Sequence, residues 1–266
     1  MVKAIKVGNL EYLVAENISV PHCFTTRQGG VSSGYLASLN LGTHRGDDPE
    51  NVTENYRILG SAVGFTPEQL VLTKQTHTDI VLPVGQEQLG AGLFAPEMPE
   101  CDGLITNTPG VGLAVFTADC TPILLHDPIT GAVGAVHAGW RGTAAAIGAR
   151  AVAAMAKHYG CIPKNIRAAI GPNIAQCCFE TDGDVPQAML ARYGDAAREF
   201  IQARGDKYYL DLKGINALSL KQAGVESISV SSLCTACEPD RFWSHRKVGK
   251  LRGSQAGIIL CKEVKP

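Results

Sequence analysis

The chain has 266 residues, of which 45% are hydrophobic and 18% are charged. A chain of this length can bury roughly 70–75% of the surface that its unfolded form exposes. The low charged fraction excludes most kinds of intrinsically disordered protein. Its 24 basic and 25 acidic side chains give a net charge of −1. This balance gives no electrostatic reason to expect binding to nucleic acid or to an anionic membrane.

The sequence also bears on location and domain organisation. Residues 1–20 contain no apolar run behind a basic segment, so we expect no secretory signal. No apolar stretch approaches the roughly 18–20 residues that a membrane-spanning helix needs. Nine cysteines, an odd number, predict reduced thiols and a cytoplasmic protein. No repeat or linker divides the chain, so we expect one domain over residues 1–266.

The first helix is the best signalled element. Asp48 can cap it, Pro49 suits its first position, and Gly64 can end it. Between these residues the apolar side chains recur at helical spacing, which predicts a helix over residues 49–63.

Strands and helices alternate along the rest of the chain. We expect a hairpin whose arms are residues 123–125 and 132–136, because residues 127–131 have turn composition. Further strands are predicted at residues 70–74, 80–84, 111–116, 166–170, 228–231 and 257–261, and further helices at residues 142–159, 185–200 and 215–222. Hairpins mixed with helices predict an α/β protein with mixed sheets.

Cys120 and His137 flank the predicted hairpin. If its turn is centred at Pro128 and Ile129, the two residues oppose each other with Cα atoms about 4.5–5.5 Å apart. A bulge at Gly131 would shift this register by one residue. His77, in a polar loop between two strands, is the natural third ligand. One Cys and two His with an open fourth position are typical of catalytic zinc.

Other interpretations of these residues stay open. Cys120 and His137 can simply be packing neighbours. They can also act without metal in a thiol hydrolase, with Cys120 as nucleophile and His137 as base. A third alternative is that they belong to a non-catalytic zinc-binding module. The Cys-x-x-Cys pair at residues 234–237 has no second pair in the sequence, so we interpret these as buried or incidental thiols. The chain has neither the His-Glu-x-x-His motif of zinc proteases nor the cytidine-deaminase signature.

Several motifs together resemble one bacterial family. The motifs are Gln75-Thr76-His77, residues 117–122 (TADCTP), residues 137–142 (HAGWRG), residues 25–32, 38–42 and 169–172, and Phe242-Trp243-Ser244-His245-Arg246. The family was long labelled multicopper polyphenol oxidase (laccase) and is now described as zinc-dependent purine nucleoside phosphorylase. The resemblance covers nearly the whole chain.

The resemblance implies both a fold and an activity. The fold is a four-layer α/β/β/α sandwich with mixed sheets, similar to a cysteine-hydrolase fold. The activity is phosphorolysis of adenosine, inosine and 5′-methylthioadenosine, with adenosine deamination as a second activity and His77, Cys120 and His137 as zinc ligands. The chain departs from the family pattern at residues 251–254, where Leu-Arg-Gly-Ser replaces the usual Thr-Gly-Arg, so the role of Arg252 is open.

Phosphorolysis requires an anion cradle and contacts to ribose and base. We expect Arg27, with Gly29 and Gly30, to bind phosphate, and Arg141, at a helix start, to bind an anion. The bland alternatives are a turn with a solvated Arg27 and a salt-bridged Arg141. Three further candidates also have a functional and a structural interpretation. Asn40 can hydrogen-bond the ribose hydroxyls or stabilise a turn, and Asp119 can orient a metal ligand, accept a proton or cap a backbone segment. Arg246 can reach the same pocket or form a structural ion pair.

Copper is the remaining question about the cofactor. A multicopper oxidase needs many histidines in His-x-His pairs, and this chain has 7 histidines and no such pair. We therefore expect zinc, with copper as an opportunistic occupant of the His/Cys site and polyphenol oxidation as a side reaction. The expected partners are purine nucleosides and phosphate, and the sequence leaves the oligomeric state open.

Overall fold

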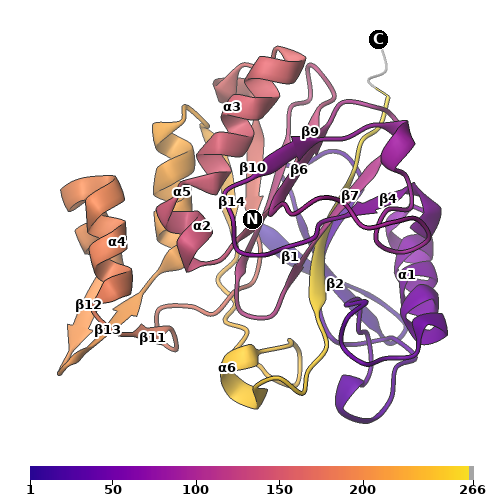
Figure 1. Cartoon of the computed structure of the whole chain (residues 1–266), viewed down its shortest axis with the longest axis horizontal. Coiled ribbons are helices and arrows are strands. Elements are labelled where there is room, and N and C mark those ends of the chain that lie inside the picture. Colours follow the sequence, from indigo (N-terminus) through magenta and orange to yellow (C-terminus); the bar gives the residue numbers. More distant parts are fainter. Residues whose placement is uncertain (264–266) are drawn as a thin grey trace.

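Two six-stranded mixed β-sheets form the centre of the computed structural model, which describes residues 1–263 (Figure 1). The first sheet has the order β1 (Val2–Val7), β2 (Leu10–Ala15), β3 (His22–Thr25), β15 (Gln255–Leu260), β7 (Gly112–Thr117) and β4 (Leu70–Leu72). The second has the order β14 (Ser227–Val230), β10 (Arg167–Ile170), β8 (Thr121–His126), β9 (Val133–Ala138), β6 (Gly103–Thr106) and β5 (Val81–Pro83).

The two sheets pack face to face and helices cover their outer faces, which confirms the four-layer arrangement. Leu113 of β7 and Leu124 of β8 share the central core, while the adjacent Ala114 turns outward, as the two-residue period of a strand requires. On that outer face the first sheet packs against α1 (Pro49–Val63). The second sheet packs against α3 (Ile147–Tyr159) and α5 (Leu212–Gln222), on the opposite side in Figure 1.

The structure confirms helix α1 with its predicted ends. The Asp48 side chain accepts a hydrogen bond from the Glu50 amide at 2.9 Å, which satisfies one of the free N–H groups of the first turn. Gly64 ends the helix in the left-handed conformation with φ 98°. Local capping chemistry therefore sets both ends of this helix.

Two predicted helices are wrong in length. Residues 142–159 lie in two helices, α2 (Trp140–Ala144) and α3, because Ala146 adopts φ 57° between them. Tertiary contacts hold this break, since the Tyr193 hydroxyl donates to the Thr143 carbonyl oxygen at 2.6 Å. The predicted helix 185–200 is α4 (Asp184–Tyr193), followed from Gly194 by 3-10 turns.

The hairpin is formed, but its predicted register is wrong. His126 pairs with Val133, so the turn is centred one residue later than expected, and this moves every partner by two positions. His137 therefore opposes Pro122 instead of Cys120. Because side chains alternate along a strand, a shift of two keeps residue 120 on the His137 side, as a diagonal neighbour.

The other predicted strands and the predicted helix 215–222 are formed, as β4, β5, β7, β10, β14, β15 and α5, whereas several further elements were not predicted from the sequence. A small antiparallel sheet of β11 (Glu180–Thr181), β13 (Lys207–Leu210) and β12 (Ile201–Arg204) projects with α4 from the side of the second sheet (Figure 1). A short helix, α6 (His245–Val248), precedes β15. Among residues 1–263, no helix has the length and apolar character to cross a bilayer. One domain over residues 1–266 stays a prediction.

Gly171 provides a test of the packing between the sheets. A Cβ atom there would lie 2.4 Å from the Phe24 ring, which is buried in the central core. We expect Gly171→Ala to lower the free energy of unfolding by about 1–3 kcal/mol through overpacking, measured by urea denaturation. The control is Gly85→Ala, whose Cβ would meet no atom closer than 3.7 Å. Equal stability of the two variants would contradict this packing.

Candidate functional site

Three side chains converge at the ends of two central strands of the second sheet, β8 and β9. His77 lies in the loop after β4, Cys120 directly precedes β8, and His137 lies in β9. Their ligating atoms lie within 4.8 Å of one another, and Cys120 Sγ is 4.0 Å from His77 Nε2. The two imidazole rings meet edge to face, with centroids 5.1 Å apart. The group predicted from the sequence is therefore assembled in the structure.

The backbone at this site is unusual at two positions. His77 has φ 63° and Asp119, which precedes Cys120, has φ 93°. Few residues other than glycine adopt this region, and such strain concentrates at functional sites. Gly139 adds a third constraint, because a Cβ there would lie 2.9 Å from the His77 ring. A side chain at this position would displace His77.

A buried carboxylate, Asp102, fixes His137. Asp102 is fully buried, and its Oδ1 lies 2.7 Å from His137 Nδ1. A carboxylate only accepts hydrogen bonds, so Nδ1 carries the proton and Nε2 is left as the ligating atom. Metal-binding histidines in proteins are typically oriented by such a carboxylate.

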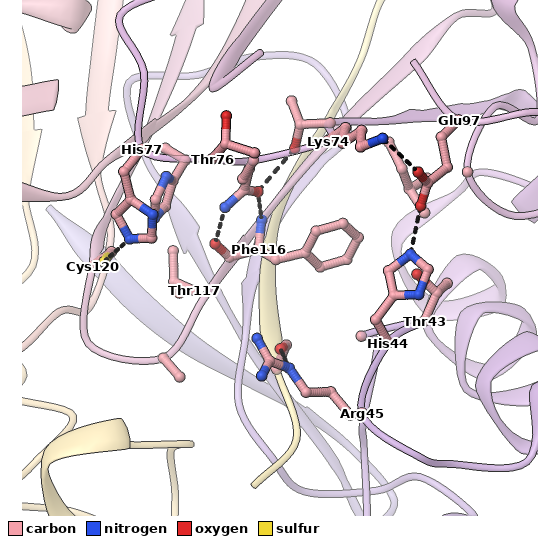
Figure 2. A pocket seen from close by; sticks show the side chains of 18 of the residues that line it. Thr43, His44, Arg45, Lys74, Thr76, His77, Glu97, Phe116, Thr117 and Cys120 are labelled. Carbon is pink, nitrogen blue, oxygen red and sulfur yellow. Dashed lines mark hydrogen bonds and ion pairs between the residues drawn. The ribbon is translucent and has the colours of Figure 1, made fainter. Parts of the chain in front are cut away.

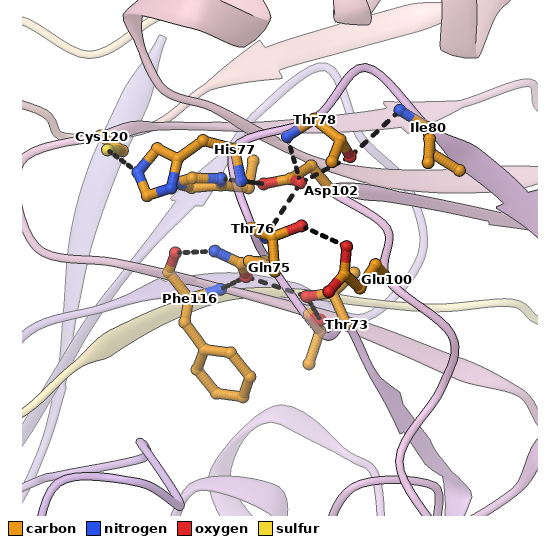
Figure 3. Close-up of polar contacts among 12 residues, drawn as sticks. Thr73, Gln75, Thr76, His77, Thr78, Ile80, Glu100, Asp102, Phe116 and Cys120 are labelled. Atoms are coloured by element: carbon orange, nitrogen blue, oxygen red, sulfur yellow. Dashed lines mark hydrogen bonds and ion pairs between the residues drawn. The ribbon is translucent and has the colours of Figure 1, made fainter.

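Asp102 also holds the loop that carries His77 (Figure 3). Its two oxygens accept hydrogen bonds from the backbone amides of Thr76, His77 and Thr78 at 3.2, 3.2 and 2.7 Å. The Thr78 hydroxyl donates to the same carboxylate at 2.8 Å. One side chain thus positions two of the three candidate ligands. The sequence analysis did not identify Asp102, although an acidic residue directly before a strongly apolar strand was a usable signal.

Gln75 anchors the other side of the same loop. Its Nε2 donates to the Phe116 carbonyl oxygen at 2.8 Å, and its Oε1 accepts from the Phe116 amide at 2.6 Å (Figure 3). The side chain thereby replaces a strand partner for β7. The loop of residues 75–78 is therefore tied to both sheets.

The electrostatics favour a thiolate at Cys120. Burial raises the pKa of Cys120, but the charge of His137 and hydrogen bonds from both histidines outweigh it and lower the pKa to about 6. Burial lowers the pKa of His137, whereas the Cys120 thiolate and the Asp102 carboxylate raise it to about 9. Without a metal, the two groups therefore form a thiolate–imidazolium pair near neutral pH.

The three side chains face a cavity of about 430 Å³, which is within the usual range for small-molecule sites (Figure 2). At one end of it lie His77, Cys120 and His137. The other lining residues are Gly42, Thr43, His44, Arg45, Leu72, Thr73, Lys74, Gln75, Thr76, Gly92, Glu97, Phe116, Thr117, Ala118, Arg252 and Ser254.

Arg45 and Arg252 bring positive charge into this cavity. Neither has an ion-pair partner within residues 1–263, whereas Glu97 is engaged by Lys74 at 3.3 Å and His44 at 2.5 Å. Burial and the charge of Arg45 lower the pKa of Arg252 to about 10, so this guanidinium is still charged at pH 7. Arg252, whose role the sequence left open, thus lines the cavity, and Arg45 was missed.

Asn40 and Asp119 are used inside the protein. Asn40 is fully buried, its Oδ1 accepts from the Gly42 and Ser254 amides, and its Nδ2 donates to Asp47. It thereby fixes two segments of the cavity wall. The Asp119 carboxylate accepts from the Thr235 hydroxyl at 2.6 Å and from the Arg246 amide at 2.7 Å. Neither lines the cavity, so their predicted roles toward substrate stay predictions.

The other three predicted arginines also lie outside the cavity lining. Arg27 stacks on Trp243 at 3.9 Å and donates to the carbonyl oxygens of Ala37 and Pro239. Arg141 is exposed and stacks on Trp140 at 4.2 Å. Arg246 donates to two carbonyl oxygens near β11. The Gly29 and Gly30 amides, expected to cradle phosphate, donate to Ser38 Oγ. Direct substrate contacts by these residues stay predictions.

The pKa of Cys120 gives a test in metal-free protein. Because only the thiolate reacts, alkylation of Cys120 by iodoacetamide should accelerate as the pH rises through about 6 and then level off. Asp102→Asn removes the charge that stabilises the His137 imidazolium, so the midpoint should move to higher pH. Peptide mass spectrometry resolves Cys120 from Cys161, an internal control whose pKa burial raises to about 11. A midpoint near 8.5, unchanged in the variant, would contradict this pairing.

Comparison with known proteins places this geometry in a family. The family model described as "Multi-copper polyphenol oxidoreductase laccase" matches residues 21–262. "Purine nucleoside phosphorylase" from Deinococcus radiodurans is 41% identical over 250 residues, covering 94% of this chain and 92% of that protein. "Purine nucleoside phosphorylase YlmD" from Bacillus subtilis is 37% identical, covering 90% of this chain and 88% of that protein.

A solved structure agrees with the sequence matches. The crystal structure of YlmD from Geobacillus stearothermophilus superposes with a TM-score of 0.91 at 35% identity, covering 98% of this chain and 99% of that chain. Sequence and fold thus match over nearly the whole length, and the chain belongs to the multi-copper polyphenol oxidoreductase laccase family.

Proposed function

We propose that the protein is a zinc-dependent purine nucleoside phosphorylase that converts adenosine, inosine and 5′-methylthioadenosine, with phosphate, to the free base and a ribose 1-phosphate. The observation that carries the proposal is the cavity itself, with the His77, Cys120 and His137 group at one end and two unpaired arginines in its wall. The names of the relatives from Deinococcus radiodurans and Bacillus subtilis support the same activity.

The donor set suits zinc. Two imidazole nitrogens and one thiolate are borderline and soft ligands, and three protein ligands leave one of four tetrahedral positions free. The distance of 4.0 Å between Cys120 Sγ and His77 Nε2 requires only a small contraction to bring both atoms onto one ion. When bound, zinc would supply Lewis-acid stabilisation of charge that develops on the substrate.

Different residues of the cavity bind different parts of the substrates. Arg45 and Arg252 supply fixed guanidinium groups that bind the attacking phosphate and hold it by charge-assisted hydrogen bonds. Phe116, whose side chain faces the cavity in Figure 2, offers a ring for stacking on the purine. Asn40 acts through the wall, because its carboxamide fixes the Ser254 segment next to Arg252.

We include adenosine deamination as a second activity of the same site. An open coordination position that serves phosphorolysis can also serve hydrolysis at a purine amino group. We further propose a cytoplasmic location, because none of the nine cysteines is in a disulfide bond in the structure, as expected in a reducing compartment.

A metal-free thiol hydrolase is the second candidate, and one observation favours it. Cys120, His137 and Asp102 form a nucleophile–base–carboxylate series, with the pKa of Cys120 lowered to about 6. His77 has no catalytic task in that mechanism. Copper chemistry is less well supported, since within residues 1–263 only His77 and His137 of the seven histidines belong to a candidate metal group.

The phosphate end can be tested with two arginine variants. Loss of a charge-assisted hydrogen bond costs about 1.5–3 kcal/mol, so Arg252→Ala should raise the KM for phosphate roughly ten- to a hundredfold, with a smaller effect on the KM for adenosine. Arg27→Ala is the matched comparison, because Arg27 lies outside the cavity lining. The assay is ribose 1-phosphate formation from adenosine.

Two outcomes would contradict this assignment. A larger phosphate effect from Arg27→Ala would restore the Gly29–Gly30 cradle expected from the sequence. Release of free ribose at an unchanged rate without phosphate would mean hydrolysis instead of phosphorolysis.

Metal removal separates the two candidate functions. A chelator should inactivate the zinc enzyme reversibly, with a greater loss at low pH as the imidazoles and the thiolate take up protons. His77→Ala should abolish turnover at ambient zinc, because losing a ligand must cost more than the roughly 10–100-fold that loss of a supporting hydrogen bond costs. Excess zinc should restore part of the activity, and ammonia release from adenosine should follow the same pattern.

The thiol hydrolase gives the opposite result. Its activity would survive chelation, and His77→Ala would change only substrate binding. Full activity of metal-free wild-type protein, measured with nucleoside and phosphate, would therefore end the zinc proposal.

A further inference from the structure

Four cysteines outside the cavity form a second cluster. The Sγ atoms of Cys177, Cys178, Cys234 and Cys237 all lie within 4.8 Å of one another. The Cys-x-x-Cys pair at residues 234–237 has no second such motif in the sequence, but in the structure it lies against another pair of cysteines. The missing partner is the adjacent pair Cys177-Cys178, which has no recognisable spacing in the sequence.

The sheet topology brings the two pairs together. Strands β10 and β14 are parallel neighbours, so the loops that leave their carboxyl ends emerge side by side. The Thr235 amide donates to the Asn173 carbonyl oxygen at 3.0 Å and continues the ladder past the strands. Cys177 and Cys178 follow in the first loop, while Cys234 and Cys237 lie in the second.

The distances fit a tetrahedral metal site. With zinc–sulfur bonds of 2.3 Å, two thiolates on one zinc lie about 3.8 Å apart. Cys237 Sγ lies 3.5 Å from the Sγ of both Cys177 and Cys178, and those two are 3.7 Å apart. Four sulfur ligands leave no position open, which is the arrangement of a structural zinc site.

Neighbouring groups support thiolates at this place. The Ala175 amide donates to Cys234 Sγ at 3.3 Å. Lys213 is buried, and its ammonium group donates to the Leu233 carbonyl oxygen at 2.8 Å, next to the cluster. A buried ammonium requires compensating negative charge, and a zinc ion with four thiolates has a net charge of −2.

We propose that Cys177, Cys178, Cys234 and Cys237 bind one zinc ion as a structural site, separate from the His77, Cys120 and His137 group. Binding replaces four S–H bonds by four zinc–sulfur bonds and releases four protons to solvent, with no change of oxidation state. Cys177 and Cys237 are exposed, so the metal can enter from solvent.

The site also supports the backbone next to Cys120. Thr235, between the two cysteines of the second loop, donates to Asp119 at 2.6 Å. Arg246 donates its amide to the other Asp119 oxygen and its guanidinium to the Cys178 carbonyl oxygen at 3.0 Å. Asp119 is thus a positioning residue, held by loops that the zinc ion would join. Its strained backbone sets the position of Cys120.

Metal counting on the full chain tests the proposal. Elemental analysis of protein purified with zinc should give two zinc ions per chain for the wild type and one for Cys177→Ser/Cys237→Ser. The control Cys161→Ala changes a cysteine of neither group and should keep two. His77→Ala/Cys120→Ala should lose the other ion, and X-ray absorption of its remaining zinc should show only sulfur neighbours at about 2.3 Å.

Two results would contradict a structural zinc site at these cysteines. An unchanged metal count in the Cys177→Ser/Cys237→Ser variant, or a disulfide among these four cysteines in the purified wild type, would overturn the proposal. If that variant does not fold, the absorption spectrum of His77→Ala/Cys120→Ala decides: a shell of four sulfurs supports the site, and nitrogen or oxygen neighbours contradict it. Neither readout depends on enzymatic activity.

Discussion

The candidate active site depends on one buried carboxylate. Asp102 accepts from His137 on one sheet strand and from three consecutive amides of the His77 loop. A carboxylate with no solvent exposure is tolerated only when its charge is compensated and its lone pairs accept hydrogen bonds. For Asp102, the groups that do this are His137 and the backbone of the His77 loop. The hydrogen bonds that satisfy this buried carboxylate are therefore the same ones that orient the two histidines.

The third ligand, Cys120, is held from the opposite side. It follows the strained residue Asp119, whose carboxylate is bound by Thr235 and by the Arg246 amide. The site thus lies between two supports, the Asp102 carboxylate directly before β6 and the segment of residues 235–246 that follows β14. Gly139 completes it by leaving space for the His77 ring.

Sequence patterns predicted what local chemistry determines. Asp48, Pro49 and Gly64 fixed helix α1, and the motifs around His77, Cys120 and His137 indicated the metal group. The break at Ala146 was not predicted, because tertiary contacts interrupt the helix there. The hairpin register was also wrong, because a turn displaced by one residue shifts every cross-strand partner by two positions. Arg45, Asp102 and the pairing of Cys177 with Cys237 escaped too, since only the packed sheets bring these residues to their sites.

We propose that His77, Cys120 and His137 together hold one zinc ion whose free position faces the cavity. Anomalous diffraction at the zinc edge, from crystals grown with adenosine and phosphate, would locate this ion. We expect a zinc peak among the three side chains, with substrate in the cavity and phosphate against Arg45 and Arg252. Absence of a peak there, with substrate bound beside an uncoordinated Cys120, would contradict it.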